Sequence, residues 1–162
     1  MPILHSAHFG PIEYAPESLV AFPFGLPAFE SERLFIRLRL PQHEPLISLQ
    51  SATTPQLAFL TVAVDRLIAD YQLELGEEDL SFLGGSDEIS AYEVLAIVAV
   101  NSDGQVTANV QAPIVIHRQR RIAIQVIQRN PAYKCHHLMG LDVAGQPVSG
   151  TTRISGGDVP CS

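Results

Sequence analysis

Several residue types that would mark a particular class of protein are scarce or missing from this 162-residue chain. Tryptophan is absent, lysine occurs once, and the two cysteines, Cys135 and Cys161, form no CxxC pair. This cysteine usage fits a reducing compartment better than a disulfide scaffold. No apolar run is long enough to span a membrane, and the N-terminal "MPILHSAHFG" lacks the basic region of a signal peptide. We therefore expect a cytoplasmic protein with no membrane association.

The composition is that of a folded domain. Hydrophobic residues make up 46% of the chain and charged residues 17%, which excludes a disordered protein. The length suggests one domain with a sizeable buried core. Because the sequence from residue 141 onward is rich in Gly, Ser and Thr, we expect a domain over residues 1–140 and a flexible tail over 141–162.

Charge is distributed unevenly along the chain, whose net charge is −7. Nine acidic residues and one arginine lie between Asp65 and Glu93, whereas five basic residues and no acidic residue lie between His117 and Lys134. An acidic surface disfavours nonspecific nucleic-acid binding and favours a basic partner. The acidic segment could equally be a solvated face that keeps the protein soluble.

Short β-prone runs separated by turns dominate the pattern. Residues 34–40 alternate in polarity, and "NSDGQ" marks the turn of a hairpin within residues 91–110. Residues 3–9 are a first strand that Gly10 should end, and "GEEDLSFLGG" predicts one helix stopped by its final glycines. About eight strands at these spacings predict an all-β, mainly antiparallel fold, a small barrel-like domain or a sandwich, with one short helix.

The stretch "TANVQAPIVIHRQRRIAIQV" at 107–126 contains a proline between two β-prone runs. Because proline donates no backbone hydrogen bond, we expect one strand to end at Pro113 and the next to begin at Ile114. The side chains of Asn109 and Gln111 are placed to satisfy the backbone groups left unpaired by that break.

Motifs for catalysis, metals and nucleotides are weak. The run "KCHH" (Lys134–His137) is the most metal-like stretch, but neighbouring residues of an extended chain point to opposite faces, so we expect no metal site. No nucleophile elbow or phosphate-binding loop is present, so we expect neither catalysis nor a cofactor. A nucleic-acid-binding barrel that uses Arg118, Arg120, Arg121 and Arg129 remains an alternative, as does a cryptic hydrolase or metal protein around Cys135, His136 and His137.

Seven segments occur in an order and at spacings that resemble a known family. They are "FGPIEY", "FPFGLPAFES", "LQSATTPQLAFLTV", "DYQLEL", "TANVQAPIVIHRQRR", "QVI" and "YKCHHL". Together they resemble the bacterial flagellar assembly factor FliW family from about Ile3 to Leu138. The resemblance implies a small non-catalytic barrel in the cytoplasm that is monomeric when free. It also implies that the protein binds either the translational regulator CsrA or flagellin, but not both at once. A flagellin chaperone without CsrA control is the alternative within this reading.

The resemblance and the charge map together suggest a partner-binding face for CsrA. Its candidate residues are Thr54, Pro55, Asp65, Asp70, Tyr71, Gln72, Glu74, Glu77 and Glu78. The family signature further includes Asn109, Gln111, Pro113 and Gln125, with a structural or contact role. Several positions depart from the family pattern, among them Ala28, Gln72 and Ala123. Ala28 replaces a usual glycine, which suggests a turn without positive φ or a shifted turn, and Gln72 replaces a carboxylate, which suggests one charge contact fewer.

Overall fold

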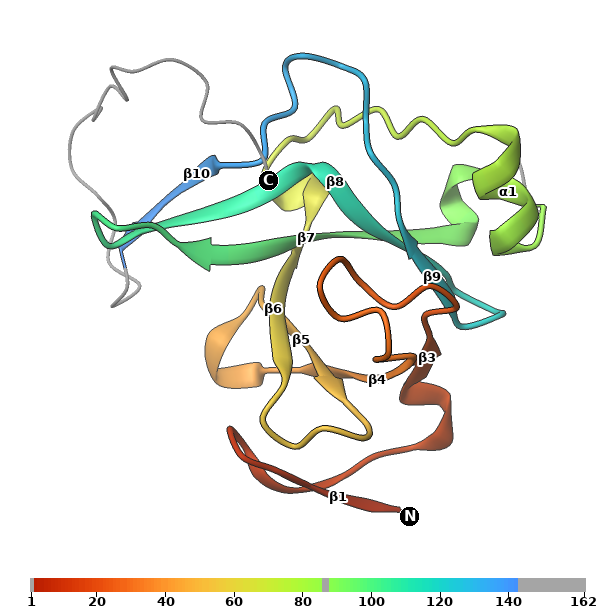
Figure 1. The fold of residues 1–162 in the computed structure, drawn as a ribbon. Coiled ribbons are helices and arrows are strands. Elements are labelled where there is room, and N and C mark those ends of the chain that lie inside the picture. Colours follow the sequence, from red (N-terminus) through yellow and green to blue (C-terminus); the bar gives the residue numbers. More distant parts are fainter. Residues whose placement is uncertain (1, 86–87, 143–162) are drawn as a thin grey trace.

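The computed structural model describes residues 2–85 and 88–142. Its strands are β1 (Ile3–Ser6), β2 (Gly10–Glu13), β3 (Leu19–Ala21), β4 (Leu34–Arg39), β5 (Ile47–Ser51), β6 (Ala58–Ala63), β7 (Tyr92–Val100), β8 (Gln105–His117), β9 (Ile122–Gln125) and β10 (His137–Asp142). One α-helix, α1 (Glu77–Leu83), and the 3-10 turns η1 (Pro16–Ser18), η2 (Pro41–His43), η3 (Val64–Arg66) and η4 (Ile89–Ala91) complete it (Figure 1). None of the helices in these ranges has the length and apolar character to cross a membrane.

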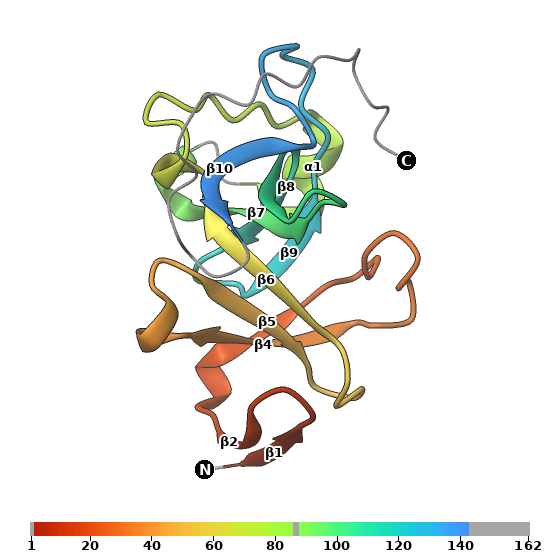
Figure 2. The same ribbon diagram turned by 90° about the vertical axis from the view of Figure 1, so that its left-hand side faces the viewer.

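Seven strands close into a mixed barrel (Figure 2). The hydrogen-bonded order is β8-β7-β6-β5-β4-β3-β9, and β9 pairs back onto β8. The only parallel contact among the described strands is the single pair between Ala21 of β3 and Ile122 of β9. β10 lies outside the barrel, paired with the first half of β8. The prediction of a mainly antiparallel β-barrel with one short helix is confirmed.

The barrel interior is filled by one hydrophobic cluster to which every barrel strand contributes. Phe22 and Phe35 meet edge to face at 4.8 Å between ring centroids, and Leu49, Leu95 and Ile114 pack around them fully buried. Two further clusters lie against β7 and β8, where the chain between β6 and α1 packs onto the barrel. That chain segment carries most of the predicted partner-binding residues, so the packing fixes where they lie.

β8 does not end at Pro113, and the prediction of a strand break there is wrong. The strand continues from Gln105 to His117. Its register against β7 shifts instead: Asn109 faces Ile97 and Ile114 faces Leu95, so four residues of β8 lie opposite one of β7. Proline is tolerated at such a bulge because no ladder hydrogen bond is required of it. The bulge lets the first half of β8 pair with β10 and the second half with β9.

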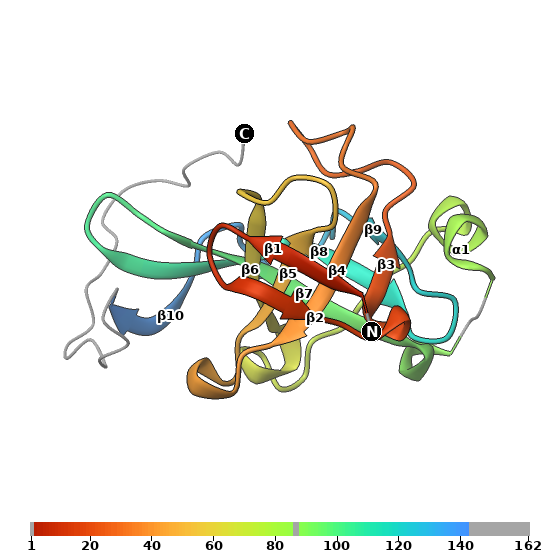
Figure 3. The ribbon, with the colours of Figure 1, turned by 90° about the horizontal axis from the view of Figure 1, so that it is seen from below.

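The N-terminal segment forms a separate two-stranded hairpin, β1–β2, which lies in front of β4 and β5 when the molecule is seen from below (Figure 3). The prediction of a single strand ended by Gly10 is wrong, because Gly10 begins β2 with a φ of 69°. In the turn, the Ser6 hydroxyl accepts hydrogen bonds from the backbone N–H groups of His8 and Phe9. At the other end, β10 includes the first two residues of the predicted tail, and the rest of that tail lies outside the described residues.

Candidate functional site

The segment from Asp65 to Glu78 runs across the outside of β7 and β8 with alternating burial. Tyr71, Leu73 and Leu75 pack inward, while Asp70, Gln72 and Glu74 between them are exposed. The segment alternates as a strand would, although it is not a strand. Its backbone groups bond to side chains of a distant part of the chain instead of to a neighbouring strand.

A pair of tyrosines anchors the middle of this segment. The rings of Tyr71 and Tyr133 stack with centroids 4.2 Å apart and planes 17° from parallel. The Tyr71 hydroxyl donates to the carbonyl of Val110 at 2.6 Å, and the Tyr133 hydroxyl accepts from the backbone N–H of Gln72 at 2.7 Å. Burial, with a smaller effect of the neighbouring Tyr133, raises the pKa of Tyr71 far above its usual value. Tyr71 therefore keeps its proton, and can donate it in a hydrogen bond, to a higher pH than an ordinary tyrosine.

Gln128 anchors the next part of the segment. Its side-chain oxygen accepts from the backbone N–H of Glu74 at 2.8 Å, and its side-chain nitrogen donates to the Glu74 carbonyl at 3.0 Å. Gln128 is 3% exposed, so the pair is shielded from water on the glutamine side. The Gln128 amide thus bonds the backbone N–H and C=O of Glu74, as a neighbouring strand would, and the Glu74 carboxylate stays on the surface.

Helix α1 follows directly and confirms the predicted short helix. Asp79 accepts a hydrogen bond from the N–H of Gly76 at 2.9 Å, which caps the helix start. Gly84 ends the helix with a φ of 106°. Glu77 and Glu78 in the first turn are exposed, where negative charge is favourable for the helix dipole.

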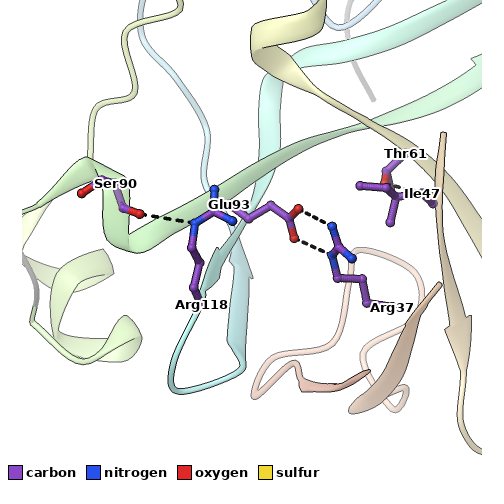
Figure 4. A network of polar contacts seen from close by, with 6 residues as sticks. All are labelled: Arg37, Ile47, Thr61, Ser90, Glu93 and Arg118. Atoms are coloured by element: carbon purple, nitrogen blue, oxygen red, sulfur yellow. Dashed lines mark hydrogen bonds and ion pairs between the residues drawn. The ribbon is translucent and has the colours of Figure 1, made fainter. Parts of the chain in front are cut away.

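Five carboxylates along this segment are exposed, and we call them the acidic face: Asp65, Asp70, Glu74, Glu77 and Glu78. Glu93, which also belongs to the acidic run of the sequence, is not part of it. Glu93 forms a two-point ion pair with Arg37 across the barrel, at 2.7 and 2.6 Å, and its side chain is only 15% exposed (Figure 4). Folding thus removes this charge from the acidic surface.

Thr54 and Pro55 are not brought together with the acidic face. They lie in the loop before β6, whereas the acidic segment begins after β6, so the length of that strand separates them (Figure 1). The Pro55 carbonyl accepts from Ala7 at 2.8 Å and so holds the N-terminal hairpin. Thr54 donates to the carboxylate of Glu32, which also accepts from the Ser51 hydroxyl at 2.7 Å. These hydroxyl donors lower the pKa of Glu32.

The signature residues of the 107–126 stretch serve the bulge of β8. Asn109 accepts from the N–H of Ala112 at 3.0 Å, as expected from the sequence. The Ala112 carbonyl accepts from the side chain of Gln125 at 2.9 Å. Gln111 contributes its backbone carbonyl, which accepts from the N–H of Gln128 at 2.6 Å. The two amide side chains that stabilise the bulge are therefore those of Asn109 and Gln125.

The four arginines of the nucleic-acid alternative lie in different local settings. Arg118 and Arg121 line a pocket at one end of the barrel. The side chain of Arg120 lies over Gly84 at the end of α1. Arg129 lies in the connection between β9 and β10.

The metal alternative concerned Cys135, His136 and His137. Across residues 2–85 and 88–142 no three His, Cys, Asp or Glu side chains gather as metal ligands. Cys135 is buried and disulfide-bonded, which differs from the expectation of reduced cysteines, and His136 is exposed. His137 opens β10, where burial lowers its pKa.

The expectation that the turn at Ala28 needs no positive φ is wrong. Its φ is 70°, in the left-handed region that favours glycine. Two hydrogen bonds hold the turn. The N–H of Phe29 donates to the carbonyl of Leu26 at 2.7 Å, and the N–H of Leu26 donates to the carbonyl of Phe29 at 3.3 Å. Alanine thus occupies the glycine conformation of this turn.

The residues that sequence reasoning missed are Tyr133 and Gln128. Their partners, Gln72 and Glu74, are 61 and 54 residues away along the chain, and no local sequence pattern predicts such contacts. A buried glutamine in a connection without regular structure is visible only once the fold is known.

Comparison with known proteins places the chain in a family. Residues 3–139 match the family described as FliW protein. A flagellar assembly factor FliW of Bacillus subtilis is 31% identical over 139 residues, 85% of this chain and 96% of the relative. Another from Geobacillus kaustophilus is 36% identical over 132 residues, 80% and 90% of the two chains. A crystal structure of the flagellar assembly factor FliW superposes with a TM-score of 0.75 at 33% identity, covering 85% of this chain and 96% of the other. The chain belongs to the FliW family of flagellar assembly factors, which are not enzymes.

Proposed function

We propose that this flagellar assembly factor acts in the cytoplasm as a partner-switching antagonist of the translational regulator CsrA. In this proposal the protein is a monomer when free and binds CsrA through the acidic face. Flagellin competes for the same protein, so accumulating flagellin releases CsrA and export of flagellin reverses the exchange. Synthesis of flagellin is thereby coupled to its export.

The observation that carries the proposal is the run of five exposed carboxylates within residues 65–78. The hydrogen bonds of Tyr71, Tyr133 and Gln128, which we call the clasp, hold the backbone from residue 71 to residue 74 in place before a partner arrives. A protein that binds RNA carries basic surface, and complementary charge raises association rate and specificity. Preorganisation lowers the entropy cost of binding. The expected partner is therefore basic and folded.

A charge-reversal experiment tests the CsrA contact. Glu74→Lys/Glu77→Lys should weaken binding of purified CsrA by at least tenfold at low salt, measured by calorimetry. The matched control is Glu13→Lys/Asp103→Lys, which changes the net charge equally at two exposed positions outside the face. Binding of the wild type should weaken as salt rises, since exposed charges are screened. Equal affinities for the two double variants would contradict the assignment of the face.

Partner exchange is tested separately. Flagellin added to a preformed complex with CsrA should release CsrA, which an RNA gel shift detects as recovered RNA binding by CsrA. The protein alone should leave the RNA unshifted. A ternary complex containing both partners would contradict the exchange.

A further inference from the structure

A pocket of about 390 Å³ lies at the end of the barrel where η1, the starts of β3 and β7 and the β8–β9 turn meet. Its polar lining consists of Glu17, Ser18, Arg37, Glu93, Arg118 and Arg121, over two apolar core side chains. None of these residues belongs to the acidic face. Three arginines against two glutamates make it a locally basic site in a protein of net charge −7.

The pocket contains a neutralised ion pair. Arg37 and Glu93 join through two hydrogen bonds at 2.7 and 2.6 Å, with side chains 26% and 15% exposed (Figure 4). A two-point pair of this kind fixes both groups and cancels their charges. The charge that a ligand meets is therefore set mainly by Arg118, Arg121 and Glu17.

The two remaining arginines are oriented by their own backbone contacts. Arg118 donates through Nε to the carbonyl of Ser90 at 3.3 Å, and Arg121 donates through Nε to the carbonyl of Arg118 at 3.0 Å. Among the described residues no carboxylate pairs with either guanidinium. Each side chain is thus held at Nε while its terminal nitrogens stay available for a planar anion.

The backbone at Arg121 is itself unusual. Its φ is 56°, in the left-handed region that glycine or asparagine would adopt with less strain. Strained backbone is retained where the surrounding structure or a function requires that residue. Here the strained residue is one that lines the pocket with its guanidinium.

We propose that this pocket binds a carboxylate of an acidic peptide segment. Arginine forks match a planar carboxylate in two-point geometry. Glu17 at the same pocket can accept from peptide N–H groups that flank the carboxylate. A polyphosphate chain carries no N–H donors, so it would leave the Glu17 carboxylate without a partner. The proposal is independent of the CsrA contact, since the two sites share no residue.

The test is a titration of the full-length ¹⁵N-labelled protein followed by NMR amide shifts. The probe is acetylated hexaglutamate, and hexaglutamine is the uncharged control. Hexauridylate and inorganic phosphate are titrated in parallel. We expect saturable shifts confined to the pocket amides, including Ser18, Arg118 and Arg121, with hexaglutamate alone.

The variant Arg118→Gln/Arg121→Asn should weaken hexaglutamate binding at least tenfold. Asparagine is chosen because it tolerates the left-handed backbone at position 121, so an unchanged melting temperature shows that the turn persists. The control Arg39→Gln removes an exposed arginine outside the pocket lining and should leave binding unchanged. No saturable shift with hexaglutamate, equal binding by the double variant, or stronger binding of hexauridylate or phosphate at the same amides would each overturn the proposal.

Discussion

Gln128 bonds both backbone groups of Glu74 through one side-chain amide, at 2.8 and 3.0 Å. The contact joins the acidic segment to the connection between β9 and β10. It makes the position of an exposed carboxylate depend on a buried amide from another part of the chain. The presentation of the acidic face can therefore be altered without changing any of its charges.

Replacing Gln128 with alanine should release the acidic segment. Two hydrogen bonds and buried side-chain contacts are lost, so we expect unfolding free energy to fall by about 1–3 kcal/mol in urea titrations. Hydrogen exchange of the Glu74 backbone amide should speed up by more than the fall in global unfolding free energy accounts for. Gln119→Ala, at an exposed glutamine in the β8–β9 turn, should be nearly neutral. Unchanged exchange at Glu74 in the Gln128 variant would contradict the clasp.

Tyr71→Phe should cost about 1 kcal/mol, because the Val110 carbonyl loses its donor. The pKa of Tyr71 is raised from 10.0 by burial, so the native state holds this proton more tightly than the unfolded state. Wild-type stability should then fall as pH rises above about 10, where only the unfolded tyrosine ionises. The phenylalanine variant should show a shallower fall between pH 10 and 11.5. Parallel curves would contradict a raised pKa at Tyr71.

Glu32 should contribute to the loss of folding stability at acidic pH. Hydrogen bonds from the hydroxyls of Thr54 and Ser51 lower its pKa below 4.5. Its contribution is complete above the unfolded pKa and is lost as pH falls through the folded pKa. The Glu32→Gln variant should therefore be less stable than wild type at neutral pH, and the difference in unfolding free energy should shrink below pH 4.5, as measured by urea unfolding. Glu13→Gln, at an exposed strand position, should keep a constant small difference.

Ala28→Gly should stabilise the protein. Relief of the left-handed strain at φ 70° is worth about 1–2 kcal/mol, and the added flexibility of the unfolded glycine offsets about half of that. We expect a rise of roughly 2 °C in melting temperature. Ala69→Gly, at an exposed alanine that is not among the positive-φ residues, should lower it. A decrease for the Ala28 variant would show that the alanine side chain stabilises the turn.

Gln72→Glu should strengthen CsrA binding if the acidic face is the contact. Gln72 is exposed between Asp70 and Glu74, and its side chain reaches only the Asp70 carbonyl, at 3.3 Å. A carboxylate here adds one charge to the face without disturbing the backbone bond to Tyr133. We expect a twofold to fivefold gain in affinity at low salt, which disappears at high salt. Gln56→Glu, in the distant loop before β6, is the matched control.

Local rules of the sequence determined a good part of this protein. Helix α1 is bounded by acidic residues at its start and by Gly84 at its end, and both signals lie in the local sequence. The hairpin turn after β7 follows from Asn101, whose side chain accepts from Asp103 and Gln105. The charge asymmetry and the family motifs are likewise readable without coordinates, because they depend on residue identity alone.

Tertiary structure decided the rest. Closure of the barrel depends on β9 meeting both β3 and β8, contacts between segments about 100 residues apart in the case of Ala21 and Ile122. Pro113 marks a bulge instead of a strand end because β8 must change partners there. Thr54 is separated from the acidic residues by the length of β6, which no spacing along the chain reveals. The sequence determined which charges exist, and the long-range pairing of strands and side chains decided which of them share a surface.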